Sequence, residues 1–402
     1  VPCGDGNVVS PYIVNESAFH FFCVFIMDGL FNMSRFSRIE NSSKIKKIAI
    51  NTGGGDAPGL NAVIRAATLS ALRQGWEVYG IRHGYRGLLD LNYMVELNKE
   101  KVKGITHLGG SILGTANKGD PFNFPIELKD SVELVDMSDK VMENFKRLKI
   151  DALITVGGDG SHRIAAKFIE KGMPIIGVPK TIDNDMIGTE VTFGFDTAVV
   201  TASEAIDKLH STAEAHERVM VVEVMGRYAG WLALHSGLSG SAHAILIPEI
   251  PFDLEKVAEK IYDREAAGRN YSIIVCAEGA FPKDGTMFSE DQGKGREVLL
   301  GGIAKYVAKE ISRITGKETR SLVLGHLQRG GSPSAFDRLL GLRFGTAAVN
   351  TLLQGKVNVM VALDPPEVKT IPIDEVIKSM KTVPMNCDTI MTARSLGVSL
   401  GD

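Results

Sequence analysis

The chain has little cysteine, little net charge and no long hydrophobic run. Its 402 residues include four cysteines, Cys3, Cys23, Cys276 and Cys387, which are too few and too scattered for a disulfide framework or a zinc site. The thiols favour a reducing, cytoplasmic setting. A formal net charge of −3 argues against general attraction to nucleic acid. An anionic ligand would therefore have to bind where a few cations lie together.

The sequence also lacks a membrane segment. The apolar stretch at residues 19–27 is too short to cross a bilayer, and no basic segment precedes it. We expect no membrane partner. Met27 or Met33 could be an alternative start, and regular patterning begins only near Lys44. We therefore expect residues 1–43 to be an extension outside the fold, and whether they belong to the mature protein stays open.

From Lys44 onwards, short apolar runs alternate with longer amphipathic segments, which is the pattern of βαβ units. Most of these runs are continuously apolar, as expected for strands covered on both faces. So many parallel strands exceed one open sheet. We predict an α/β fold with two Rossmann-like lobes, each a mostly parallel sheet in a three-layer αβα arrangement. The predicted strands are 48–52, 77–81, 152–156, 175–178, 219–224, 244–247, 272–276, 322–324 and 358–362, and the predicted helices include 139–147, 197–213, 254–267 and 296–314.

Glycine-rich turns follow two of the predicted strands, in "NTGGGDAPGL" and "TVGGDGSH". Neither is a Walker loop or a dinucleotide Gly-x-Gly-x-x-Gly motif. Glycine lets backbone N–H groups approach a phosphate, and the positive end of the following helix favours the same ligand. Asp159 beside such a cradle would repel phosphate unless a cation intervened, which indicates Mg²⁺. Plain glycine turns with a helix-capping Asp or Ser are the alternative.

The segment "PKTIDND", residues 179–185, follows the next predicted strand of the same lobe. Thr181, Asp183 and Asp185 should therefore lie near both glycine-rich turns. The spacing of the two aspartates predicts that they face one side of an extended segment. One carboxylate could then accept a proton from an attacking hydroxyl while the other supports a metal. A polar turn is the alternative.

Two later segments supply positive charge. Arg218 stands before a predicted strand and Arg227 just after it, while Arg320 and Arg329 flank another. Guanidinium groups bind phosphate dianions through two parallel hydrogen bonds. Glu278, at a further strand end, could bond sugar hydroxyls. Solvated surface arginines are the ordinary alternative.

Five motifs in this order resemble the 6-phosphofructokinase family: "GGDAPGLNAVIR", "GGDGS", "TIDND", "VVEVMGRYAG" and "LGHLQRGGSP". The resemblance runs from about Lys44 to about Met380. It implies an enzyme of glycolysis that transfers the γ-phosphate of ATP, or a phosphate of pyrophosphate, to the 1-hydroxyl of fructose 6-phosphate with Mg²⁺ as cofactor. It also implies a cytoplasmic homo-oligomer, a dimer or tetramer, whose active sites are shared between subunits.

The resemblance assigns roles to individual residues. Asp183 would take the proton, Thr181 and Asp185 would complete the transfer site, Arg227 would stabilise the phosphoryl group in flight, and Asp159 would hold Mg²⁺. Donor contacts are implied for Gly54, Tyr85, Asn117, Lys118, Gly160, Ser161 and Lys180. Fructose 6-phosphate contacts are implied for Met225, Gly226, Glu278, His326 and Arg329, and for Arg218 and Arg320 from a neighbouring subunit. The implied domains are a donor lobe, 44–194 plus 328–377, and a fructose 6-phosphate lobe, 195–327 plus 378–402.

The donor signature of this sequence is mixed. Pyrophosphate-dependent members of the family typically carry Asp where this chain has Gly160 and Lys where it has Lys180, whereas common bacterial ATP enzymes have Gly at both. An Asp side chain would obstruct the α-phosphate of a nucleotide, and Gly160 leaves that space open. We therefore predict ATP rather than pyrophosphate as the donor.

Other departures concern arginines. Asn117 or Lys118 stands where the bacterial ATP enzymes carry a donor-site arginine. Leu69, Tyr93 and His210 stand where their regulatory arginines are expected, so we do not expect activation by ADP through those contacts.

Two other functions are the alternatives. "GGDG" also occurs in lipid and NAD kinases, but those lack "TIDND" and the paired arginine segments. An idle sugar-phosphate-binding or regulatory subunit would be expected to have lost Asp183 or Arg227, and both are present.

Overall fold

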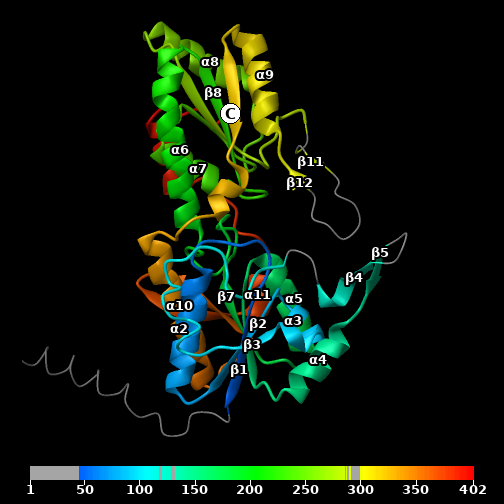
Figure 1. Ribbon diagram of the computed structural model, residues 1–402. Helices are drawn as coiled ribbons and strands as arrows, with labels where there is room; N and C mark the ends of the chain where they lie inside the picture. Colours follow the sequence, from blue (N-terminus) through cyan, green and yellow to red (C-terminus); the bar gives the residue numbers. More distant parts are fainter. Residues whose placement is uncertain (1–44, 117–119, 128–131, 286, 288, 291–298) are drawn as a thin grey trace, which may run out of the picture. The chain divides into compact units, whose positions relative to one another are not determined.

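The computed structural model describes residues 45–402 except 117–119, 128–131, 286, 288 and 291–298 (Figure 1). The chain separates into two units, Val1–Ser43 and Lys44–Asp402, and the described elements all belong to the second. The expected extension, residues 1–43, and the two donor-site positions Asn117 and Lys118 lie outside the described residues.

The larger of two main sheets has seven strands in the order β15-β14-β7-β6-β1-β2-β3. Its inner strands are parallel, whereas the edge strands β3 and β15 pair antiparallel with β2 and β14. The strands are β1 (Lys47–Thr52), β2 (Glu77–Ile81), β3 (Met94–Glu96), β6 (Ala152–Gly157), β7 (Ile175–Pro179), β14 (Val359–Asp364) and β15 (Glu367–Pro372).

Helices cover both faces of this sheet because its central strands are apolar on both sides. On β1, Ile48 and Ile50 belong to the core formed with α2 and α10, while Ala49 between them belongs to the core formed with α3, α4, α5 and α11. The sheet is therefore the middle of three layers. The helices are α2 (Leu60–Arg73), α3 (Arg86–Leu89), α4 (Ser138–Arg147), α5 (Asp159–Glu170), α10 (Ala335–Leu353) and α11 (Ile373–Val376).

The second main sheet has four parallel strands in the order β13-β8-β10-β9. On β8, Val222 packs in the core with α6, α7 and α12, and Val221 packs in the core with α8 and α9. The strands are β8 (Val219–Val224), β9 (Ala244–Leu246), β10 (Ser272–Ala277) and β13 (Thr319–Val323), and the helices are α6 (Phe195–Ala215), α7 (Trp231–Ser239), α8 (Leu254–Ala266), α9 (Ile303–Thr315) and α12 (Asp388–Ser395).

Short elements connect these layers. They are the ribbon of β4 (Phe124–Glu127) and β5 (Val132–Val135), the ribbon of β11 (Ser289–Glu290) and β12 (Leu299–Leu300), and the 3₁₀ helices η2 (Leu91–Tyr93), η3 (Pro121–Asn123) and η4 (Gly325–Arg329). Taken over the described residues, none of the helices combines the length and apolarity that a membrane crossing requires.

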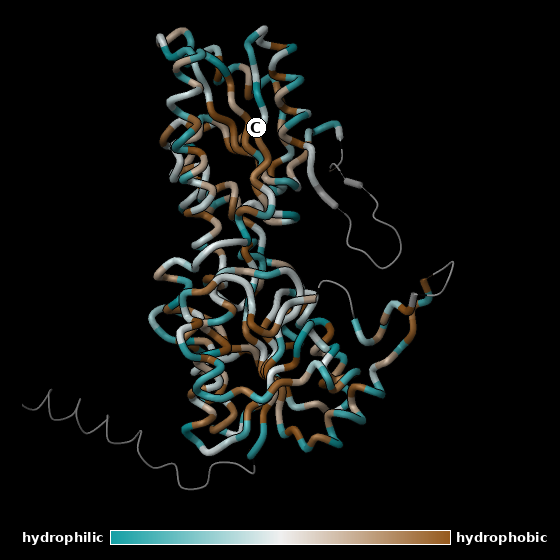
Figure 2. The backbone as a smooth tube through the Cα atoms, in the orientation of Figure 1, coloured by the Kyte–Doolittle hydropathy of each residue, from teal (hydrophilic) through white to brown (hydrophobic). Residues whose placement is uncertain are grey.

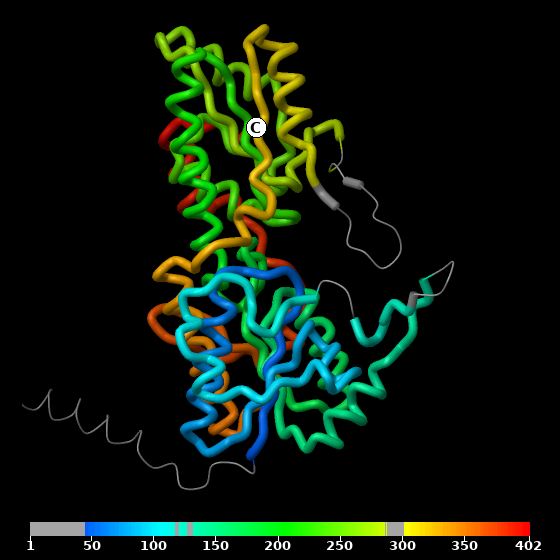
Figure 3. Tube along the Cα trace, viewed as in Figure 1, coloured from blue at the N-terminus to red at the C-terminus, as the bar shows by residue number. Residues whose placement is uncertain are grey.

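The chain visits the larger sheet first, builds the smaller one, and then returns. Figure 3 shows this path by colour: the orange residues of β14 and β15 lie with the blue and green strands of the larger sheet, and the red residues of α12 lie with the smaller. In Figure 2 the brown, hydrophobic residues concentrate on the central strands. The larger sheet is therefore formed from two separate stretches of sequence, whereas the four strands of the smaller sheet all lie within residues 219–323.

The predicted α/β class with mostly parallel sheets is confirmed. The helix predicted over 296–314 is wrong at its start, because α9 begins at Ile303 after Gly301 and Gly302, which both have positive φ and break a helix. The strand predicted over 322–324 lies earlier, as β13. Cys276 and Cys387 are free thiols.

Candidate active site

Three parallel strands of the larger sheet, β1, β6 and β7, end at the same edge, and a cavity of about 570 Å³ lies there. Loops that leave the carboxyl ends of parallel strands commonly form binding sites. Side chains from all three loops line this cavity, and Arg227 and Tyr228 from the loop after β8 complete it. The described lining includes Gly54, Tyr85, Asp159, Gly160, Ser161, Lys180, Thr181, Asp183, Asp185, Arg227 and Arg329, all of which were predicted from the sequence.

The helix α5 begins at Asp159, immediately after β6, so its positive N-terminal end borders the cavity. Ser161 in its first turn packs against the two glycine-rich turns. A methyl group at Gly53 would lie 2.6 Å from the Oγ of Ser161, and one at Gly157 would lie 2.3 Å from it. These glycines are therefore needed for close packing of the two turns, and Gly54, with φ of 73°, is needed for the turn itself.

Lys180 places a positive charge at the bottom of this cradle. Its side chain is buried, and its Nζ donates a hydrogen bond to the carbonyl oxygen of Gly55. Burial and then the nearby Arg329 lower the pKa of Lys180 to about 8, against the opposing effect of Asp183. An anion in the cavity would favour the charged form of this lysine.

The two aspartates of "TIDND" line the cavity as expected, but the segment is not extended. Asn184 between them has φ of 52°, and its Oδ1 accepts a hydrogen bond of 3.1 Å from the backbone N–H of Thr192. The backbone N–H of Asp183 donates to the Oγ1 of Thr181 at 3.1 Å. A left-handed residue, rather than strand alternation, therefore brings Asp183 and Asp185 to one side.

Asp185 is a half-buried acid with two other acids, Asp183 and Asp159, near it. Burial first, and then the charge of Asp183, raise the pKa of Asp185 to about 7. Its Oδ1 is buried and accepts no hydrogen bond from the described residues. An oxygen in this state suits a cation or a hydrogen-bond donor brought by a ligand.

Asp159 is the first residue of α5 and lines the cavity. Its carboxylate pairs with the Nε of Arg163 at 2.8 Å. Within the described ranges, no three His, Cys, Asp or Glu side chains are grouped closely enough to hold a metal by themselves. The carboxylates present fit Mg²⁺, which takes one or two protein carboxylates and fills its other positions with phosphate oxygens and water.

Two arginines approach from the elements after β8 and β13. Arg227 lies with its guanidinium carbon 5.8 Å from the centre of the Tyr228 ring and lines the cavity. Arg329, at the end of η4, donates from Nη1 to the carbonyl oxygen of Asp56 at 3.1 Å. Arg329 thus docks on the first glycine-rich turn, next to Gly55.

Glu278 follows β10 and lies close enough to the cavity to feel its charges. Burial and then Asp183 raise the pKa of Glu278 to about 7, and Arg227 opposes that rise. The next residue, Gly279, has no room for a side chain, because a methyl group there would lie 1.7 Å from the carbonyl oxygen of Arg227. Gly226 has φ of 125°, and Met225 packs on the core beneath. Glu278, Met225 and Gly226 border the cavity lining without being part of it.

Three predicted residues lie elsewhere. Arg218 and Arg320 are at the start of β8 and β13, the opposite ends of the strands from Arg227, and both pair with Glu318, at 3.3 Å and 2.7 Å. The six residues of β8 separate the two ends by about 20 Å. His326 lines a different depression, together with Leu324 and Leu327.

Some lining residues were not predicted. Arg163 and Lys167 follow Asp159 at intervals of four along α5 and line the cavity with it. That spacing places all three on one helix face, so the sequence contained the signal. Met380 also lines the cavity, and no local motif marks it.

Burial raises the pKa of Tyr85, whose ring packs on Phe168 at 4.9 Å between centres.

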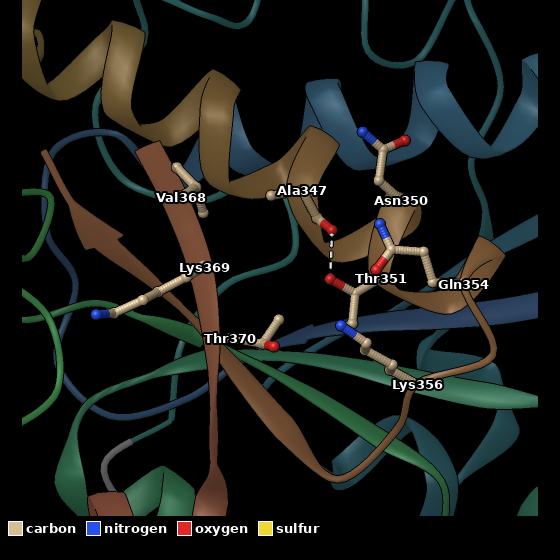
Figure 4. A pocket seen from close by; sticks show the side chains of 8 residues that line it. All are labelled: Ala347, Asn350, Thr351, Gln354, Lys356, Val368, Lys369 and Thr370. Atoms are coloured by element: carbon tan, nitrogen blue, oxygen red, sulfur yellow. Dashed lines mark hydrogen bonds between the residues drawn. The ribbon is translucent and has the colours of Figure 1, made fainter. Parts of the chain in front are cut away.

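A separate cavity of about 320 Å³ lies between the end of α10 and β15 (Figure 4). The lining hydroxyl of Thr351 donates to the carbonyl oxygen of Ala347. Lys369 extends away from the other lining side chains (Figure 4) and pairs with Asp364 at 2.7 Å. No carboxylate or histidine is part of the described lining, so this cavity lacks a group that could act as a general base.

Comparison with known proteins matches this arrangement to one family. The family model described as Phosphofructokinase matches residues 47–352. The ATP-dependent 6-phosphofructokinase of Chloroflexus aggregans is 49% identical over 361 residues, which is 90% of this chain and 99% of that protein. The pyrophosphate–fructose 6-phosphate 1-phosphotransferase of Streptomyces coelicolor is 46% identical over 342 residues, which is 84% of this chain and 96% of that protein.

A solved structure has the same fold. The crystal structure of Pichia pastoris phosphofructokinase in the T-state aligns with a TM-score of 0.71 and 30% sequence identity, over 89% of this chain and 37% of that longer chain. With the family model and a relative of nearly half-identical sequence, this likeness establishes that the chain belongs to the phosphofructokinase family.

Proposed function

We propose that the protein transfers the γ-phosphate of ATP to the 1-hydroxyl of fructose 6-phosphate, giving fructose 1,6-bisphosphate. The observation that carries this proposal is the shared cavity, in which Asp183 and Asp185 face a helix N-terminus, Lys180 and Arg227. Phosphoryl transfer needs positioning and charge compensation more than covalent chemistry, and these groups supply both.

The donor phosphates bind at the N-terminus of α5. Backbone N–H groups near Gly54, Gly160 and Ser161 contact them, and the ammonium group of Lys180 neutralises part of their charge. Tyr85 borders the same end of the cavity. Asn117 and Lys118 remain proposed donor contacts.

Asp183 accepts the proton of the attacking hydroxyl. Thr181 orients Asp183, because the Oγ1 of Thr181 accepts a hydrogen bond from the backbone N–H of Asp183. Arg227 stabilises the negative charge on the phosphoryl group during transfer. The carboxyl group of Asp185 completes the transfer site.

Mg²⁺ is the proposed cofactor, with Asp159 as its protein ligand and Asp185 as a supporting carboxylate. Bound there, the ion would neutralise donor phosphate charge. The buried Oδ1 of Asp185, which accepts no hydrogen bond from the described residues, supports this assignment.

The acceptor side is completed by a second subunit. Met225, Gly226, Glu278 and Arg329 lie at or beside the cavity in one chain, whereas Arg218 and Arg320 lie at the far end of their strands. We propose that these two arginines, and with them the sugar phosphate site, are shared across a homo-oligomer. His326 stays a proposed acceptor contact. A cytoplasmic location and the division into donor and fructose 6-phosphate lobes belong to the same proposal.

Pyrophosphate is the second candidate donor, and Lys180 is the observation that favours it. The relative from Chloroflexus aggregans, at 49% identity, is named for ATP, and the one from Streptomyces coelicolor, at 46%, is named for pyrophosphate. Relatives named for ATP at 44–49% identity outnumber it, so pyrophosphate is the less favoured donor. Gly160 favours ATP, since a side chain there would meet no neighbouring atom within 4 Å and the space stays free for a nucleotide.

The test is a product assay with fructose 6-phosphate, Mg²⁺ and either donor. We expect wild-type turnover with ATP to exceed turnover with pyrophosphate. Asp183→Asn should lower kcat by about 10² to 10⁴, because the base acts in the transition state, and leave both KM values within a few-fold. Asp207→Asn, an exposed aspartate of α6, is the control. Absence of fructose 1,6-bisphosphate with both donors, or half the wild-type kcat in Asp183→Asn, would contradict the proposal.

A further inference from the structure

Residues 180–192, here called the acid loop, carry Asp183 and Asp185. Residues 380–383, here called the strap, run beside that loop although they come from a distant part of the sequence. Met380 and Met186 form an antiparallel β-bridge, and the backbone N–H of Lys381 donates to the carbonyl oxygen of Asp185 at 2.8 Å. The strap is therefore attached to the backbone of a proposed transfer-site residue.

The side chain of Lys381 makes a second attachment to the same loop. Its Nζ donates to the carbonyl oxygens of Glu190, at 2.5 Å, and Thr189, at 3.3 Å. Burial lowers the pKa of Lys381, and Glu190 and Asp185 oppose that shift. One residue thus holds the acid loop at two points, through its backbone near the aspartates and through its ammonium group at the far side.

Lys381 and the strap are in turn fixed to α7, which follows the loop of Arg227. The indole N–H of Trp231 donates to the carbonyl oxygen of Lys381 at 3.0 Å, and the Nζ of Lys381 lies 5.2 Å from the Trp231 ring centre. The backbone N–H of Val383 donates to Glu249 at 2.8 Å. Glu249 also accepts the backbone N–H of Gly230, at 3.0 Å, at the N-terminus of α7.

These contacts form a continuous connection from the two aspartates to the loop that carries Arg227. We propose that Lys381 is a positioning residue, which fixes the distance between the carboxylates of the acid loop and the guanidinium of Arg227. The inference rests on the proposed phosphoryl transfer. Beyond that function, the proposal is that the strap aligns the two sides of the transfer site although none of its groups takes part in the reaction. Misplacement of reacting groups by about 1 Å can cost about 10²-fold in rate.

The experiment compares Lys381→Met, Lys381→Arg and Lys378→Met. Methionine keeps most of the apolar stem of Lys381 but cannot donate to Thr189 and Glu190, whereas arginine can. Lys378 is an exposed lysine on the approach to the strap, so Lys378→Met is the matched control. We expect Lys381→Met to lower kcat by about 10- to 100-fold with both KM values within about three-fold, and Lys381→Arg to recover most of the loss.

Amide hydrogen exchange supplies a readout that does not depend on activity. Peptides covering residues 181–192 should exchange faster in Lys381→Met than in wild type or Lys378→Met, because the loop has lost two of its attachments. Unchanged exchange there, or a kcat within two-fold of wild type, overturns the inference. So does a parallel loss of substrate affinity that Lys381→Arg fails to correct.

Two further outcomes remain distinguishable. If Lys381→Met does not fold, Trp231→Phe decides. It keeps a smaller ring beside the ammonium group but removes the bond to the Lys381 carbonyl, and it should lower kcat and loosen residues 181–192 in the same sense. Wild-type kcat in Trp231→Phe then overturns the inference. If the wild-type protein phosphorylates nothing, the proposed function has failed, and the exchange measurement still tests the strap.

Discussion

Gly160 lies in the first turn of α5, where its missing side chain keeps the cavity open. A methyl group at this position would meet no atom within 4 Å, and its φ is in the ordinary range. A side chain can therefore be introduced here without strain on the fold. Any change in activity would report on the ligand rather than on stability.

Gly160→Asp should lower turnover with ATP far more than turnover with pyrophosphate, because the added carboxylate repels the α-phosphate that only the nucleotide carries. Gly160→Ala, which adds bulk without charge, should change ATP turnover much less. Steady-state rates with each donor at saturating Mg²⁺ are the measurement. A wild-type protein faster with pyrophosphate than with ATP would show that Gly160 does not determine the donor.

The N-termini of α6 and α10 are joined by a buried polar cluster. The Oδ2 of Asp337 accepts from the backbone N–H and the Oγ1 of Thr197, at 2.8 Å and 2.5 Å. The Oγ of Ser334 caps α10 by accepting a hydrogen bond from the backbone N–H of Asp337. The same Oγ donates to Asp196 at 2.5 Å. Burial raises the pKa of Asp337 to about 6. The carboxyl group of Asp337, a residue of α10, thus caps the N-terminus of α6.

Stability should depend on pH through Asp337. Because the folded pKa, about 6, exceeds the unfolded value of about 3.9, the folded state retains a proton that the unfolded state loses. The contribution of this group is fully present below about pH 4 and is lost as pH rises through 6. Asp337→Asn cannot ionise but keeps an acceptor for Thr197.

Urea unfolding between pH 4 and pH 7 is the measurement. As the pH rises across this range, the free energy of unfolding of Asp337→Asn minus that of wild type should increase by about 1–3 kcal/mol. Parallel curves for the two proteins would show that the carboxyl group is ionised throughout and that its burial does not affect stability.

The central strands of both sheets were predicted from the sequence, whereas the edge strands of the larger sheet were missed. The strands β1, β2, β6 and β8 are mostly apolar, and their positions were predicted to within a residue at each end. The edge strands β3 and β15 were missed, because Glu367–Pro372 alternates charged and apolar residues and is half exposed, as an outer strand tolerates.

The same division holds in the site. Chain order was enough to bring Asp183 to the two glycine-rich turns, since all three follow parallel strands of one sheet. It was not enough for Asn184, whose left-handed backbone replaced the predicted extension. Lys381 carries no motif at all, because a residue that bonds carbonyl oxygens leaves no side-chain pattern in the segment it holds.

The distribution of arginines over the chain has a consequence for assembly. Arg218 and Arg320 share Glu318 at one end of the smaller sheet, while Arg227 is at the other end. If both ends contribute to one sugar phosphate site, that site must combine two subunits. An inactive subunit that lacks one end could then complement another that lacks the opposite end.

A mixture of Arg320→Ala and Asp183→Asn subunits, unfolded together and refolded as hybrids, should be more active than the sum of the two parents. Arg320 is exposed, so its truncation should not disturb folding. A mixture of Asp183→Asn and Arg227→Ala is the control, since both groups lie in one cavity and no hybrid restores it. Purely additive activity in the first mixture would mean that each chain forms its site alone.

Lys381 follows every strand of both main sheets in the chain. The N-terminal part of a polypeptide leaves the ribosome first, and folding can begin as later segments emerge. The glycine-rich turns and the acid loop can therefore fold before the strap, which supplies Met380 to the cavity lining, has been translated. A nascent chain at that stage carries the glycine-rich turns and the aspartates without the strap, so we expect full activity only after residues 380–383 have been translated.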